Sequence, residues 1–165
     1  MSSGYLESIV AFLKEIGLST REETLTEETF LPGIRISQGT LVFDRARLTW
    51  PGDLLHEAAH LAIVPAARRC ELDDRLADLE EISDLGEIEA TAWSFAAATH
   101  LSLPLPELFH EGGYHGRSQS LILTYSAGVY PGVAGLERAG MTVTGVRAVE
   151  QGMRAFPCMQ RWLRM

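Results

Sequence analysis

The stretch WPGDLLHEAAHLAIV occupies residues 50–64, and the expected fold is built outward from it. Pro51 suits the first turn of a helix, because the N–H that proline lacks would have no intrahelical partner there. Asp53 suits the positive end of the helix dipole. Pro65 disfavours further helix in the residue before it. We therefore predict a helix that begins at residue 51 or 53 and ends at residue 64.

His56 and His60 are four residues apart, so a helix places both imidazoles on one face, one turn apart. Two nitrogens in that arrangement can bind one zinc ion at roughly 2.0–2.1 Å. Glu57 can then accept a proton from a metal-activated water. Coincidence is the alternative, but the helix is otherwise apolar, and inward-facing histidines without a metal would need costly polar partners. We predict Zn²⁺ at His56 and His60, with Glu57 as the general base.

A catalytic zinc usually has a third protein ligand and an open position. The candidates are the later acidic residues and histidines, namely Glu80, Glu81, Glu87, Glu89, His100, His110 and His115. We favour Glu89, which lies 29 residues after His60 inside an alanine-rich helix expected at 87–100. Its small, apolar neighbours would bury the carboxylate, and a metal would compensate that cost. Glu87 lies nearer the helix start and can instead interact with the helix dipole.

Hydrolysis also needs a group that stabilises an oxyanion. The glycine-rich loop at residues 111–116 carries Tyr114 and His115, which we predict as the best candidates. An exposed loop histidine without a role is the alternative for His115. Tyr125 and Tyr130 are candidates too, but we expect both to pack in the core.

The remaining pattern predicts an α+β fold in a single domain, residues 1–165. Residues 34–43 alternate around Gln38-Gly39 and indicate a β-hairpin. We expect a small, partly antiparallel sheet on a helical body, with the metal-binding helix beneath the sheet and a cleft between them. The acidic stretch at residues 70–84 is typical of a solvated helix or mobile loop. Further helices are predicted at residues 5–16, 26–30 (a short turn), 118–126, 131–139 and 152–164.

Together, the hairpin, the His56-Glu57-Ala58-Ala59-His60 helix and the later run from Glu89 to Ala96 resemble a known family. They are similar to the ImmA/IrrE-like metallopeptidases, a gluzincin-type branch of the HExxH zincins. The resemblance covers roughly residues 34–106. It implies zinc bound by His56, His60 and Glu89, with Glu57 as the general base. The last sixty residues match nothing in that family, so the resemblance does not imply a particular substrate.

Charge and composition narrow the function classes. The chain has 22 acidic residues against 14 lysines and arginines, a formal charge of −8, which argues against a nucleic-acid partner or an anionic membrane. We see neither a basic leader with an apolar run nor an 18-residue apolar stretch, so we expect a cytoplasmic protein outside the membrane. The oligomeric state is not predicted.

The sequence therefore favours a zinc-dependent hydrolase, most simply a metallopeptidase that acts on a peptide or protein substrate. Two alternatives stay open. Two histidines and a carboxylate can also bind iron in a non-haem oxygenase, and other metal enzymes use the same ligands. A metal-stabilised binding or regulatory domain without turnover is the non-enzymatic alternative.

Overall fold

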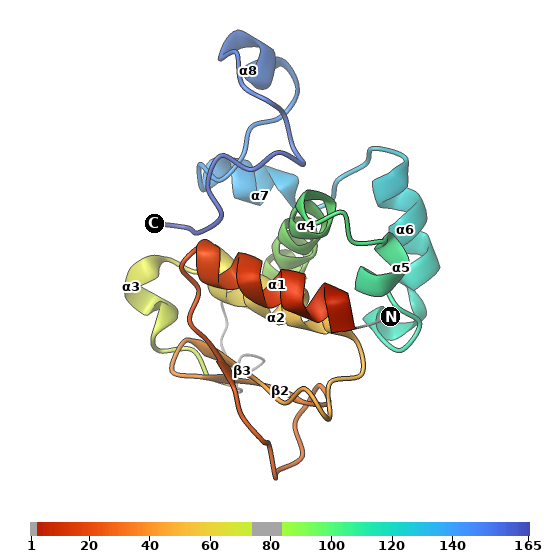
Figure 1. Ribbon diagram of the computed structural model, residues 1–165. Coiled ribbons are helices and arrows are strands. Elements are labelled where there is room, and N and C mark those ends of the chain that lie inside the picture. The colour runs from red at the N-terminus through yellow and green to blue at the C-terminus, as the bar shows by residue number, and fades with distance from the viewer. Residues whose placement is uncertain (1–2, 74–83) are drawn as a thin grey trace.

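A computed structural model describes residues 3–73 and 84–165 (Figure 1). The described part combines helices with one small sheet, so the predicted α+β class and the partly antiparallel sheet are confirmed. The helical elements are α1 Ser3–Glu15, α2 Pro51–Ile63, α3 Ala66–Arg69, α4 Asp84–His100, α5 Leu105–Leu108, the 3₁₀ turn η2 Tyr114–Gly116, α6 Ser118–Ser126, α7 Val133–Arg138 and α8 Gly145–Glu150.

The sheet contains β1 (Thr20–Glu22), β2 (Ile34–Ser37) and β3 (Thr40–Phe43), in the order β1-β3-β2. β2 and β3 are antiparallel, which confirms the hairpin, and β1 pairs with β3 in parallel. The two turn residues, Gln38 and Gly39, both have positive φ angles, 48° and 72°. That conformation suits the twist of a two-residue hairpin. The parallel strand β1 was not predicted, because three residues are too few to show a pattern.

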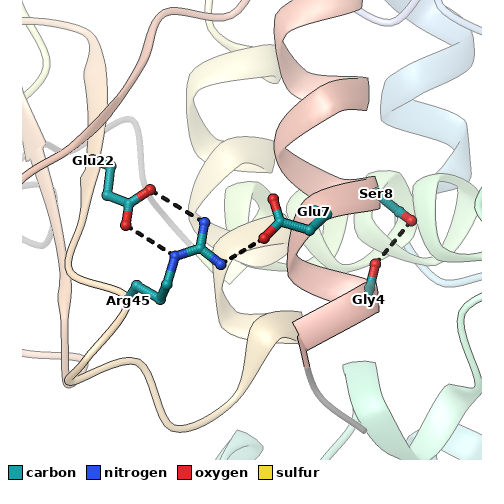
Figure 2. Close-up of polar contacts among 5 residues, drawn as sticks. All are labelled: Gly4, Glu7, Ser8, Glu22 and Arg45. Carbon is teal, nitrogen blue, oxygen red and sulfur yellow. Dashed lines mark hydrogen bonds and ion pairs between the residues drawn. The ribbon is translucent and has the colours of Figure 1, made fainter.

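Arg45, just after β3, ties the sheet to the first helix. Its guanidinium group donates to Glu22 of β1 through Nε and Nη2, at 2.9 and 3.2 Å, and to Glu7 of α1 through Nη1, at 2.7 Å (Figure 2). All three side chains are at least two-fifths exposed, so solvent screens the pairs. The ion pairs of Arg45 therefore orient α1 over the sheet more than they stabilise the fold.

Helix α2 lies in the middle of the molecule, between the sheet and α4. In Figure 1 the sheet lies below α1 and α2, while α7 and α8 lie on the far side of α4. Leu54, Leu55 and Leu61 are fully buried, and each contributes roughly 1.5–3 kcal/mol through its burial. Ala58, Ala59 and Ala62 are also fully buried, so the α2 backbone can lie close to its neighbours. The Ser94 hydroxyl of α4 donates to the Ala90 carbonyl at 2.7 Å and lies 3.4 Å from the Leu55 carbonyl, so it marks the face that α4 turns toward α2.

Helix α2 ends because Val64 is extended (ψ 140°) before Pro65. Arg69 then caps this end: its Nε donates to the Leu61 carbonyl at 2.8 Å, and its Nη2 donates to the Val64 carbonyl at 3.2 Å. The C-terminal tail docks at the same place, because the Arg164 backbone N–H donates to the Ala62 carbonyl at 2.9 Å.

Two predicted helices are absent, and both regions show why. Residues 26–30 are irregular because the Thr29 hydroxyl donates to the Leu31 carbonyl and accepts from the Gly33 N–H, replacing helical bonds. Residues 152–164 are also irregular. Their backbone donors bond to distant segments; Phe156, for example, donates to the Val143 carbonyl. A helix would need those donors for its own carbonyls.

The other helices match their predictions within a few residues, apart from α3, α5 and α8, which were not predicted. Most of the acidic stretch at 70–84 lies outside the described residues. Among the described residues, no helix has the length and apolar character needed to cross a membrane.

Candidate metal centre

The two histidines of α2 lie on the buried face of the helix, as the four-residue spacing predicts. Their ring centroids are 4.9 Å apart and the rings are perpendicular. The His60 side chain is only 6% exposed and that of His56 is 15% exposed. One potential ligand atom from each of His56, Glu57 and His60 lies within 4.8 Å of the others. These residues can therefore approach a single cation.

Glu87, in the first turn of α4, faces both histidines. Its Oε2 lies 3.4 Å from the Nε2 atom of His56, and its Oε1 lies 3.3 Å from the Nε2 atom of His60. Both Nε2 atoms thus point toward one carboxylate, which is half exposed. Two imidazole nitrogens and one carboxylate are a donor set that zinc and other divalent transition metals accept.

Glu89 does not share this position, which corrects the predicted choice of third ligand. Residues two apart on a helix project about 200° apart, so Glu87 and Glu89 cannot face the same neighbour. The Glu89 carboxylate turns toward α7, where its Oε1 lies 3.8 Å from Nη2 of Arg138. It also fills the space that a Cβ on Gly135 would occupy. The glycine and the arginine explain how this carboxylate is accommodated without a metal.

The protonation states in this cluster follow from burial and charge. Burial, followed by the positive charge of neighbouring His56, lowers the pKa of His60 to about 4. Burial opposes a charge on His56 as well, but the hydrogen bond with Glu87 and the negative charge of Glu57 raise the pKa of His56 above its usual range. The hydrogen bond with His56 in turn lowers the pKa of Glu87. Near neutral pH, His60 is therefore uncharged and can donate its lone pair to a metal.

Each imidazole uses its Nε2 atom toward Glu87, and the Nδ1 atoms of both rings are buried without a hydrogen-bond partner in the described part of the chain. Unpaired buried nitrogens are costly, and such groups in native structures call for a specific reason. The Nδ1 atoms are not the atoms that face Glu87, so a metal held between the two Nε2 atoms and Glu87 would not pair them.

Tyr114 closes one side of the cluster. Its ring packs edge-on against His56, with centroids 5.6 Å apart, and its hydroxyl is buried without a hydrogen-bond partner among the described residues. Burial, and then the charges of Asp53 and Glu87, raise the pKa of Tyr114 far above its usual range. The phenol is therefore neutral and can donate a hydrogen bond.

His115 is exposed at the next position, and its charge contributes to the lowered pKa of Glu87. The structure thus brings the Tyr114–His115 turn to the histidine cluster. The roles predicted for the two side chains stay predictions.

No family model, curated protein or solved structure matches this chain. The resemblance to the HExxH metallopeptidases therefore rests on the motif residues alone.

Two further candidates among the described residues make their contacts away from the two histidines. His100 packs in an aromatic group, with its ring centroid 5.4 Å from those of both Phe12 and Trp162. Tyr125 is buried and donates to the Pro131 carbonyl at 3.0 Å, so its predicted packing role is confirmed. Glu80 and Glu81 lie outside the described residues.

Glu87 was among the candidate ligands in the sequence, but Glu89 was favoured, because both glutamates lie in an alanine-rich helix and Glu87 could instead interact with the helix dipole. In the structure, the Ser94 hydroxyl lies 3.4 Å from the Leu55 carbonyl of α2, and Ser94 is seven residues after Glu87, so both residues lie on the face of α4 that is turned toward α2.

Proposed function

We propose that this chain is a metal-dependent hydrolase that binds one zinc ion through His56, His60 and Glu87. The observation that carries the proposal is the Glu87 carboxylate, whose two oxygens lie 3.3 and 3.4 Å from the Nε2 atoms of the two histidines. Three convergent donors leave a coordination position for water, which distinguishes a catalytic zinc site from a closed structural one.

Bound zinc would polarise a carbonyl group and lower the pKa of a water molecule toward about 7. Glu57 lies next to His56 in the sequence, and its carboxylate reaches within 4.8 Å of the histidine ligand atoms. We assign it the role of general base, which accepts a proton from the attacking water and delivers it to the leaving group. His56 and His60 hold the ion from α2, and Glu87 holds it from α4, so the packing of these two helices fixes the ligand geometry.

A peptide or protein is the substrate class that we propose. The support is the helix-borne HExxH motif, a carboxylate ligand from a later helix, and the resemblance of both features to zincin-type metallopeptidases. The neutral Tyr114 hydroxyl is a donor that could stabilise negative charge on a carbonyl oxygen, as peptide hydrolysis requires.

The decisive experiment compares Glu57→Gln with wild type for zinc content and peptide hydrolysis. Glutamine keeps the size of the side chain but cannot accept the proton at neutral pH, so the variant should retain zinc and lose hydrolysis by at least about 100-fold. Glu150→Gln, on α8, is a matched control that should cleave at the wild-type rate. Equal hydrolysis by Glu57→Gln would remove Glu57 from the mechanism.

The same donor set supports one other candidate, a non-haem iron enzyme, since two histidines and one carboxylate also bind Fe(II). Metal analysis of protein purified without added metal distinguishes the two. Iron with oxygen-dependent turnover would favour the second candidate. Bound zinc without cleavage of any peptide in a broad library would favour a metal-stabilised binding domain.

A further inference from the structure

Beside the candidate metal centre lies a buried aspartate–histidine pair that the proposed chemistry does not use. Asp53, in the first turn of α2, accepts a hydrogen bond from Nε2 of His110 at 2.7 Å. The two residues are only 8% and 3% exposed. Burying polar side chains of this kind costs free energy of desolvation, and an apolar pair of similar size would avoid that cost. A role in holding a neighbouring segment in position would explain why this pair is buried here.

The chain wraps around the His110 ring immediately afterwards. Trp50 stacks on one face of the ring, with centroids 4.5 Å apart and an angle of 7° between the planes. A Cβ at Gly113 would lie 3.0 Å from Cε1 of the imidazole, so the glycine backbone lies directly against it. The His110 carbonyl accepts hydrogen bonds from the Ser118 hydroxyl at 2.5 Å and from the Gly113 N–H at 3.2 Å. Both the ring and the backbone of His110 therefore fix the turn that follows.

That turn is strained. Tyr114 and His115 both have positive φ angles, 57° and 52°, and neither is a glycine. The left-handed conformation costs roughly 1–2 kcal/mol for each such residue. It persists only where surrounding contacts impose it. Its consequence is that the Tyr114 ring lies against His56, and the Tyr114 phenol lies near the negative charges of Asp53, Glu87 and Glu57.

We propose that Asp53 and His110 are positioning residues: the pair holds the strained turn in place and so keeps the Tyr114 ring against His56, beside the candidate metal centre. Asp53 is well suited to this task, because it lies on the same helix, and the same helical face, as His56 and His60. One rigid helix thus carries both the metal ligands and the attachment point of the turn. The use of the hydroxyl in a reaction rests on the proposed function, whereas the attachment is a property of the fold.

The rate at which tetranitromethane nitrates Tyr114 measures whether the Asp53–His110 pair holds the turn in place, which we call the attachment of the turn. Trypsin releases residues 76–117 as one peptide in which Tyr114 is the only tyrosine, so mass spectrometry can follow this side chain alone. In Asp53→Ala and His110→Phe we expect nitration at least about tenfold faster than in wild type, because the turn can open. Asp53→Asn can still accept the hydrogen bond from His110 and should stay close to wild type.

A matched control separates this local effect from general loss of stability. Asp44 is another buried carboxylate, and it accepts the Leu25 and Ala46 backbone N–H groups, both at 2.9 Å, far from the turn in the sequence. Asp44→Asn should lower the melting temperature without faster nitration of Tyr114. Zn²⁺ affinity of Asp53→Ala should stay within about tenfold of wild type, because the Asp53 carboxylate is hydrogen-bonded to His110 and not to a proposed metal ligand.

Measurements of hydrolysis test whether the Asp53–His110 pair positions Tyr114 for the reaction. With a substrate of the wild-type protein, Asp53→Ala should show a lower kcat with little change in KM, and Asp53→Asn should restore the activity. Equal nitration in wild type, Asp53→Ala and His110→Phe would overturn the attachment. Unchanged kcat in a variant whose Tyr114 is freely nitrated would overturn the positioning role. If nitration rises as expected but the zinc-loaded wild type cleaves nothing, the attachment stands and the proposed hydrolase function fails.

Discussion

At the scale of single residues, two glutamates two positions apart have opposite environments. Glu87 faces two imidazoles and Glu89 faces α7. We predict that Glu87→Gln weakens Zn²⁺ binding at least about 100-fold, since even changes to residues that contact only the ligands of a zinc ion cost roughly 10–100-fold. Glu89→Gln is the matched control and should bind zinc within about threefold of wild type. Competition with a fluorescent chelator measures both. If Glu89→Gln weakened zinc binding more than Glu87→Gln, the third ligand would be Glu89 and not Glu87.

Asp44 provides a pH-dependent prediction at the same scale. The backbone N–H of Leu25, together with that of Ala46, holds the pKa of Asp44 below its usual 3.8. A depressed pKa in the folded state stabilises the protein above the unfolded value and loses that contribution as the pH falls through the folded value. Asp44→Asn should therefore unfold at lower denaturant concentration than wild type at pH 7, and the difference should shrink below pH 3.8. A difference that grows in acid would contradict the assignment.

At the scale of elements, the approach of α5 to α2 depends on Gly52. A Cβ at this position would overlap the Glu107 carbonyl oxygen and lie 2.7 Å from Cα of Leu108. Backbone cannot move aside as a flexible side chain can, so Gly52→Ala should lower the free energy of unfolding by roughly 1–3 kcal/mol. Gly4→Ala, where a Cβ would meet nothing within 4 Å, should leave it unchanged or raise it by up to about 1 kcal/mol. Urea titrations compare the two variants; equal stability would contradict the close approach.

The elements that sequence predicts best are those whose signals are local. Helix α2 has a proline in its first turn and another proline two residues after its last residue, and the hairpin has alternating residues around Gln38-Gly39. Both formed where the pattern placed them. Such signals act within a few residues, and they include the four-residue spacing that brings His56 and His60 together.

The elements that sequence predicts poorly are those decided by distant partners. The tail at residues 152–164 has a helical pattern, but its backbone N–H groups bond to carbonyls such as those of Val143 and Ala62. The choice of the third metal ligand was difficult to make from the sequence for a related reason. Choosing between Glu87 and Glu89 requires the rotation of α4 about its axis, which depends on contacts such as that of Ser94 with Leu55.

At the scale of the whole molecule, the candidate site joins three segments that are far apart in the sequence. Helix α2 supplies both histidines and Asp53, α4 supplies Glu87, and the turn after His110 supplies Tyr114. The other end of α2 is held by Arg69 and the C-terminal tail. Because α2 contacts each of these segments, a ligand that binds across α2 and α4 should stabilise the entire fold.

That coupling gives a global prediction for metal binding. Zn²⁺ at 100 times its dissociation constant should add about 2.7 kcal/mol to the free energy of unfolding. For a chain of this size that corresponds to a rise in Tm of roughly 5–10 °C. Differential scanning calorimetry measures the rise, which EDTA should reverse. Glu87→Gln should show little of it, whereas Glu57→Gln should keep most of it because its proposed role is proton transfer. The same Tm with and without saturating zinc would mean that the two imidazoles and the Glu87 carboxylate do not bind the ion together.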